Sequence, residues 1–257
     1  MSKIAEAFKD KKAFIPFITC GDPDLDTTKE IIRQLVKNGA DLIELGIPFS
    51  DPTAEGPVIQ GANVRALSNH ITTDDIFKMV EEIRGEVPLP MVFMTYANVV
   101  FSYGMDRFFG RCAEIGMDGI ILPDVPFEEK DEFEASAAAH GIDFISMVAP
   151  TSEERIARIA ENAKGFIYIV SSLGVTGERS SINSNVKELV DKVKKSSKVP
   201  CAIGFGISTP RQAADMAEIA DGAIMGSAIV RLIGEYGKDA PAHVGEFVKS
   251  IKSAYTA

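Results

Sequence analysis

Two carboxylates stand eleven residues apart in one stretch of the chain, and their surroundings suit acid–base chemistry. Glu44 interrupts an apolar run at residues 42–47, and Glu55 follows in a loop rich in proline and glycine. The run predicts a buried strand and the loop a stiff, irregular connection. A carboxylate within a buried strand needs a partner, a water molecule or a function. The second carboxylate lies on a loop able to fold back over the end of this strand. Together the two carboxylates are suited to exchanging protons with a substrate. Taken singly, each residue is equally explained as a solvated glutamate.

Strands and helices that would position these carboxylates alternate along the whole chain. Apolar runs recur about every 20 to 35 residues and are separated by helical patterns. The strands are predicted at residues 13–20, 42–47, 90–96, 119–123, 143–149, 166–171, 201–205 and 223–225. The helices are predicted at residues 2–10, 27–38, 58–67, 73–84, 106–115, 128–139, 152–162, 185–195 and 210–219, with further helices at the C-terminus.

Eight strands, each followed by a helix, predict an α/β fold with a parallel sheet covered by helices. In 257 residues they fit a single (β/α)8 TIM barrel domain over residues 1–257, with an extra N-terminal helix. An open doubly wound sheet is the alternative, but no GxGxxG pattern follows the first strand. Barrel enzymes work at the carboxyl ends of their strands. The barrel therefore places Glu44 and the loop of Glu55 where chemistry is expected.

Glycines at the ends of the last three strands predict a phosphate site. They occur at residues 173–177, at Gly204 and Gly206, and at Gly226, which precedes Ser227. Glycine lets the backbone approach an anion, and a helix beginning at Ser227 would favour negative charge at its N-terminus. Aromatic residues at or near strand ends can wall a flat apolar group, although core packing explains each of them as well. They are Phe17, Tyr96, Tyr168 and Phe205.

Composition excludes several classes of function. The formal charge of −10 argues against a nucleic-acid partner. We expect a cytoplasmic protein, because no apolar run is long enough to span a membrane and the N-terminus lacks a hydrophobic signal core. The three cysteines are scattered without metal-like spacing, so we expect buried thiols and no metal site.

Six motifs at these strand ends resemble the α subunit family of tryptophan synthase. They read FITCGDPD, ELGIPFSDP followed by EGP, MTYANVVF, SSLGVTGERS, IGFGIS and GSAIV. The resemblance runs nearly end to end. It implies a TIM barrel that cleaves indole-3-glycerol phosphate by a retro-aldol reaction to indole and glyceraldehyde 3-phosphate, in the last steps of tryptophan biosynthesis.

The resemblance also implies a role for each matching residue. Glu44 would transfer the proton at C3 of the indole ring, and Glu55 would hold the ring N–H. Thr176 would close over the site and bond the second carboxylate. The phosphate would be held by Gly177, Gly206, Gly226 and Ser227. Contacts to the substrate would come from Phe17, Ile59, Tyr168 and Phe205.

Two positions depart from the best-known members of the family. Those members carry Asp where this chain has Glu55, and an apolar residue where it has Thr53. Glutamate keeps the charge but adds one methylene, which is enough to misplace a group whose geometry must hold to about 0.5 Å. We expect the loop to compensate.

Partners and cofactors follow from the same resemblance. It implies no cofactor in this chain, a β subunit that carries pyridoxal phosphate, and a tetramer of two α and two β chains. Residues 48–57 and 98–103 resemble the family's surface against the β subunit. Three alternatives stay open, namely a barrel that mainly activates its partner, a stand-alone lyase of the same family, and another phosphosugar enzyme such as an isomerase.

Overall fold

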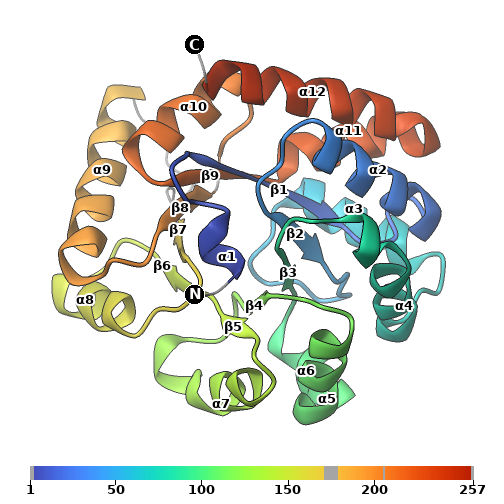
Figure 1. The fold of residues 1–257 in the computed structure, drawn as a ribbon, viewed down its shortest axis with the longest axis horizontal. Helices are drawn as coiled ribbons and strands as arrows, with labels where there is room; N and C mark the ends of the chain where they lie inside the picture. Colours follow the sequence, from blue (N-terminus) through green and yellow to red (C-terminus); the bar gives the residue numbers. More distant parts are fainter. Residues whose placement is uncertain (1–2, 171–178, 205, 256–257) are drawn as a thin grey trace.

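Parallel strands form a ring that helices surround on the outside (Figure 1). The computed structural model describes residues 3–170, 179–204 and 206–255. Within them nine strands pair in the order β5-β4-β3-β2-β1-β9-β8-β7-β6. The strands are β1 (Ala13–Thr19), β2 (Ile43–Gly46), β3 (Met91–Met94), β4 (Gly119–Ile121), β5 (Asp143–Phe144), β6 (Ser146–Val148), β7 (Ile167–Val170), β8 (Cys201–Gly204) and β9 (Gly222–Met225). The predicted TIM barrel is confirmed.

The barrel closes at Ile145. One strand was predicted over residues 143–149, and the structure instead has two, β5 and β6, on either side of this residue. β5 pairs with β4, whereas β6 pairs with β7. The Ile145 N–H donates to the carbonyl of Ile120 at 2.9 Å. Because the hydrogen-bond ladder changes side here, the predicted fifth strand is divided into two short ones that join the two ends of the sheet.

The helices lie mainly in the predicted segments. They are α1 (Lys3–Glu6), α2 (Leu25–Lys37), α3 (Pro57–Leu67), α4 (Thr73–Ile83), α5 (Ala97–Tyr103), α6 (Met105–Glu114), α7 (Asp131–Ala139), α8 (Glu153–Glu161), α9 (Arg179–Ser196), α10 (Pro210–Ile219), α11 (Ser227–Tyr236) and α12 (Ala240–Tyr255), with short 3-10 turns η1 (Arg84–Glu86), η2 (Phe127–Glu129) and η3 (Gly237–Asp239). Three predictions differ from the structure: α1 is shorter than residues 2–10, α9 begins six residues before the predicted 185, and α5 was not predicted. In place of further helix after α1, Phe8 turns into the barrel and packs at 5.8 Å, centroid to centroid, against Phe166.

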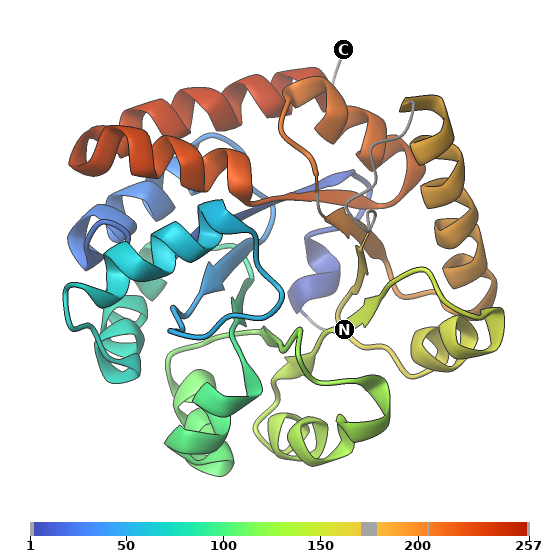
Figure 2. The same ribbon diagram turned by 180° about the vertical axis from the view of Figure 1, so that it is seen from behind.

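Alternate residues of each strand face the inside of the ring, as the two-residue period of a strand requires. The short helix α1 lies in the middle of the ring in both views (Figure 1, Figure 2), and fully buried Ile4 belongs to the interior core. This core consists of Ile4, Ala7, Phe8, Ala13, Ile15, Leu42, Val92, Ile121, Ile145, Phe166, Tyr168, Ala202 and Ile224. The interior is therefore packed from the end covered by α1, which leaves the opposite end, where the strands terminate, for a site.

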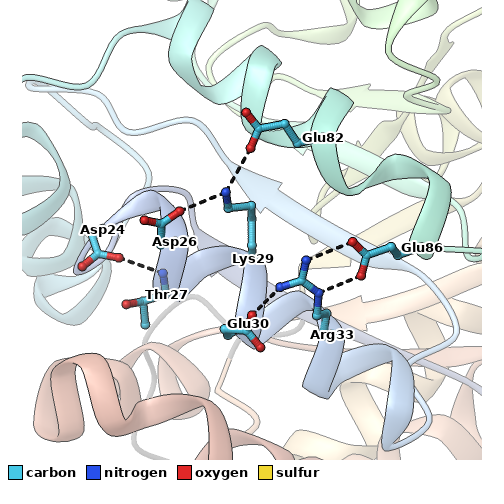
Figure 3. Close-up of polar contacts among 8 residues, drawn as sticks. All are labelled: Asp24, Asp26, Thr27, Lys29, Glu30, Arg33, Glu82 and Glu86. Carbon is cyan, nitrogen blue, oxygen red and sulfur yellow. Dashed lines mark hydrogen bonds and ion pairs between the residues drawn. The ribbon is translucent and has the colours of Figure 1, made fainter.

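Charged side chains tie neighbouring outer helices together (Figure 3). Lys29 on α2 donates to Glu82 on α4 at 2.9 Å, and Arg33 donates to both oxygens of Glu86 at 2.7 and 2.9 Å. The Asp24 side chain caps α2 by accepting from the N–H of Thr27 at 2.7 Å. These exposed pairs stabilise the outer layer only slightly. No helix in the described part of the chain is long and apolar enough to cross a membrane.

Candidate active site

A cavity of about 310 Å³ opens at the carboxyl ends of the strands. Its walls come from strands β1, β2, β3, β7 and β9, the loops after β2 and β8, and helices α3 and α11. The lining residues are Phe17, Glu44, Ala54, Glu55, Gly56, Ile59, Met94, Tyr168, Gly206, Ile207, Ser208, Ile224, Gly226, Ser227, Ala228 and Arg231. The size suits a small metabolite.

Glu44 projects into the cavity from the middle of β2. Its neighbours Ile43 and Leu45 belong to the outer core, so the residue between them faces inward. The side chain is 1% exposed, and its Oε2 has no hydrogen-bond partner among the described atoms. Burial, with a smaller contribution from the charge of Glu55, raises the pKa of Glu44 to about 8. Glu44 is therefore a neutral carboxylic acid near pH 7, able to donate a proton.

Glu55 reaches the same cavity from the loop between β2 and α3. Its Oε2 accepts from the Asn63 amide at 2.7 Å, and its backbone carbonyl accepts from Gln60 at 2.8 Å. The Tyr96 hydroxyl accepts from the Ala54 N–H at 3.1 Å. Burial raises the pKa of Glu55, whereas hydrogen bonds from Asn63 and Tyr96 oppose this rise. The two carboxylates thus differ in environment, since Oε2 of Glu44 has no hydrogen-bond partner in the described part of the chain.

Backbone amides line the end of the cavity next to α11. Gly206 has a φ of +74°, and an added Cβ there would meet nothing within 4 Å, so the backbone is accessible. Helix α11 begins at Ser227, with Gly226 as its N-cap. The Val230 N–H bonds to the carbonyl of Gly226 at 3.0 Å, so the amides before Val230 have no helical acceptor. Such a helix N-terminus favours an anion.

Two aromatic rings wall the space between these ends, and two glycines make room for them. A Cβ on Gly46 would lie 2.7 Å from Cζ of Phe17, and one on Gly204 would lie 2.3 Å from the hydroxyl oxygen of Tyr168. Phe17 packs in a small cluster with Ile59, Ala62 and Val230. Together with Ile59, the rings form an apolar slot that suits a flat aromatic group.

The cavity brings together eight of the residues selected from the sequence: Phe17, Glu44, Glu55, Ile59, Tyr168, Gly206, Gly226 and Ser227. Tyr96 does not line the cavity, and its hydroxyl instead forms hydrogen bonds with the loop that carries Glu55. Thr176, Gly177 and Phe205 lie outside the described residues. No group of side chains in the described ranges could hold a metal ion.

Sequence reasoning missed the other lining residues, among them Met94, Ile224 and Arg231, and it missed Asn63, which bonds to Glu55. Two of them carried a usable signal. Asn63 stands four residues after Ile59 on α3, and Arg231 four residues after Ser227 on α11, so each lies one turn along the same helix face. Arg231 is the one basic residue among the described lining residues.

Sequence comparison relates the whole chain to one family. The family model for the tryptophan synthase alpha chain matches residues 4–255. The tryptophan synthase alpha chain of Lacticaseibacillus casei is 51% identical over 257 residues, covering 100% of this chain and 97% of that one. The alpha chain of Petrotoga mobilis is 47% identical over 253 residues, covering 98% of this chain and 96% of that one.

Comparison with solved structures identifies the same family. The tryptophan synthase subunit alpha of Legionella pneumophila superposes with a TM-score of 0.91 at 39% identity, covering 100% of this chain and 99% of that one. A chain of the tryptophan synthase a2b2 complex of Pyrococcus furiosus superposes with a TM-score of 0.86 at 33% identity, covering 95% of this chain and 99% of that one. The chain belongs to the tryptophan synthase alpha chain family.

Proposed function

We propose that Glu44 and Glu55 carry out the cleavage of indole-3-glycerol phosphate, the reaction of the family to which this chain belongs. One observation carries the assignment: a buried, unpartnered carboxyl oxygen on an inner strand opens into the same cavity as a second carboxylate. Breaking the bond between C3 of indole and the side chain requires a proton at C3, because an indole carbanion is a poor leaving group. The raised pKa of Glu44 favours the protonated form that such a transfer needs, which supports this role.

The steps balance with these two residues alone. Glu44 donates its proton to C3, and the ring becomes a cation whose N–H bonds to the Glu55 carboxylate. The Glu44 carboxylate then takes the proton from the hydroxyl next to C3. The carbon–carbon bond breaks, its electron pair returns to the ring, and the hydroxyl carbon becomes the aldehyde of glyceraldehyde 3-phosphate. Glu44 ends as the acid it began as, and indole is released.

The remaining lining residues would bind the substrate. Phe17 and Tyr168 would hold the indole ring, and the amides near Gly206 and Ser227 would bind the phosphate. Arg231 adds a positive charge to a cavity that otherwise holds two carboxylates. The predicted contacts of Thr176, Gly177 and Phe205 remain proposals from the family resemblance.

The partner is proposed to be a β subunit in a tetramer of two α and two β chains, the assembly named for the Pyrococcus furiosus neighbour. Phe101 on α5 is 66% exposed. It lies within residues 98–103, which resemble part of the family's surface against the β subunit. We propose that this chain needs no cofactor, that pyridoxal phosphate belongs to the β subunit, and that the protein works in the cytoplasm.

The direct test is an assay of the purified chain with indole-3-glycerol phosphate, measuring indole with and without added β subunit. We expect indole from the chain alone and a faster rate with the partner. Strong activity without any partner would exclude a mainly regulatory role. Absence of indole in both arms, with the substrate bound, would refute the lyase function.

A further inference from the structure

The amide of Asn63 donates a hydrogen bond directly to the carboxylate of Glu55. Asn63 lies on α3 and is 4% exposed, and its Nδ2 is 2.7 Å from Glu55 Oε2. Glu55 itself lies in the loop between β2 and α3, outside any helix or strand. No backbone ladder therefore orients its carboxylate, and contacts from neighbouring side chains must do so.

We propose that Asn63 is a positioning residue that holds Oε2 of Glu55 and so orients the carboxylate toward the ring N–H of the substrate. This inference rests on the proposed function of Glu55. An ionised carboxylate only accepts hydrogen bonds, so the amide must present its NH₂ group. Oε2 is then tied to a helix as well as to the loop that carries Glu55.

The chemistry of an amide suits this task. Asparagine donates at every working pH and carries no charge, so it does not neutralise the carboxylate as a lysine would. The titratable groups that interact with Glu55 are Glu44 from β2 and Tyr96 before α5. Arg231 from α11 lines the same cavity. Burial raises the pKa of Glu55, and the hydrogen bonds from Asn63 and Tyr96 counter this rise.

The reach of glutamate at this position also fits. Glu55 stands where the best-known family members carry Asp, so its carboxylate extends one methylene further from the loop. The 2.7 Å bond shows that the longer side chain ends within reach of α3. The helix amide would thereby set where the carboxylate stops.

The test uses Asn63→Asp, which keeps the shape of the side chain and replaces the donor with a second acid. We expect kcat at pH 7 to fall about 10- to 100-fold, since a hydrogen bond to a charged group is lost. We expect KM to change little. The acidic limb of the pH profile, where kcat falls at low pH, should move to higher pH because Glu55 becomes harder to ionise.

Gln60→Ala is the matched control. Gln60 bonds to the backbone carbonyl of Glu55 at 2.8 Å, so this variant loosens the same loop without touching the carboxylate. Its acidic limb should stay in place. If Asn63→Asp and Gln60→Ala give the same profile, Asn63 acts only by anchoring the loop and the proposal is overturned.

A Glu55→Gln background separates this proposal from the proposed function. If Glu55 acts as proposed, Glu55→Gln lowers kcat, and adding Asn63→Asp has no further effect on the acidic limb. A wild-type rate in Glu55→Gln would refute the role of Glu55 itself. A further shift of the limb in the double variant would overturn the role of Asn63 while leaving that of Glu55 intact.

Discussion

Replacing Glu44 by Gln should abolish activity and yet stabilise the folded protein at neutral pH. The pKa of Glu44 is raised from 4.5 to about 8, mainly by burial. Between these two values the folded state keeps a proton that the unfolded state has lost. Raising the pH through this window therefore favours unfolding, and the destabilisation is complete above pH 8.

The magnitude follows from the linkage between protonation and folding. Each pH unit in this window costs the wild-type protein about 1.4 kcal/mol of unfolding free energy. Glutamine cannot ionise, so Glu44→Gln escapes this cost. Relative to its value below pH 4.5, the stability advantage of the variant should be roughly 3 kcal/mol at pH 7 and about 5 kcal/mol above pH 8.

The assay is urea unfolding of wild type and Glu44→Gln at pH 5, 7 and 8.5. The quantity to compare is how the difference in unfolding free energy between variant and wild type changes with pH. Any effect of the substitution that does not depend on pH cancels in this comparison. Glu161→Gln is the control, since Glu161 is exposed at the end of α8. We expect the difference for Glu44→Gln to grow with pH and that for Glu161→Gln to do so much less. A flat difference for Glu44→Gln would mean that the pKa is ordinary, and the reasoning on burial would fail.

Substitutions at three further positions test the rest of the site. Glu55→Asp should lower kcat about 10- to 100-fold, because a shortened side chain no longer reaches both Asn63 and the substrate; unchanged kinetics would show that this reach is immaterial. Arg231→Ala should raise KM about fivefold with kcat unchanged. Because the effect is electrostatic, Arg231→Lys should keep most of the wild-type KM, and high salt should reduce the difference in KM between wild type and Arg231→Ala. Gly46→Ala should cost about 1–3 kcal/mol of unfolding free energy and weaken substrate binding, because the new Cβ would lie 2.7 Å from the Phe17 ring; equal stability and KM would contradict this.

The sequence predicted the barrel because its signals are local and repeated. Apolar runs and helical patterns each reflect the period of one element, and their alternation leaves few arrangements. The structure differs from the prediction where contacts between residues far apart in the sequence determine the ends of an element. Helix α1 ends early because Phe8 packs on Phe166, far along the chain. The fifth strand divides at Ile145 because its two halves pair with different neighbours.

The site was predictable in part for the same reason. Glu44 stood out because a carboxylate within an apolar strand is unusual, and Glu55 because of the irregular loop around it. Asn63 carried a weaker signal, because its place one turn beyond Ile59 on α3 points to the site only once the loop before the helix is placed. Its contact with Glu55 depends on how the loop folds back, which local patterns do not determine.

The most direct measurement is single-turnover release of indole from indole-3-glycerol phosphate by Glu44→Gln, with Glu161→Gln as the matched variant. Binding of glyceraldehyde 3-phosphate is measured alongside, to show that the phosphate end of the cavity is intact. We predict that Glu44→Gln slows release by about 1000-fold or more while this binding persists, and that Glu161→Gln behaves like wild type. Release at the wild-type rate by Glu44→Gln would contradict the assignment of Glu44 as the proton donor.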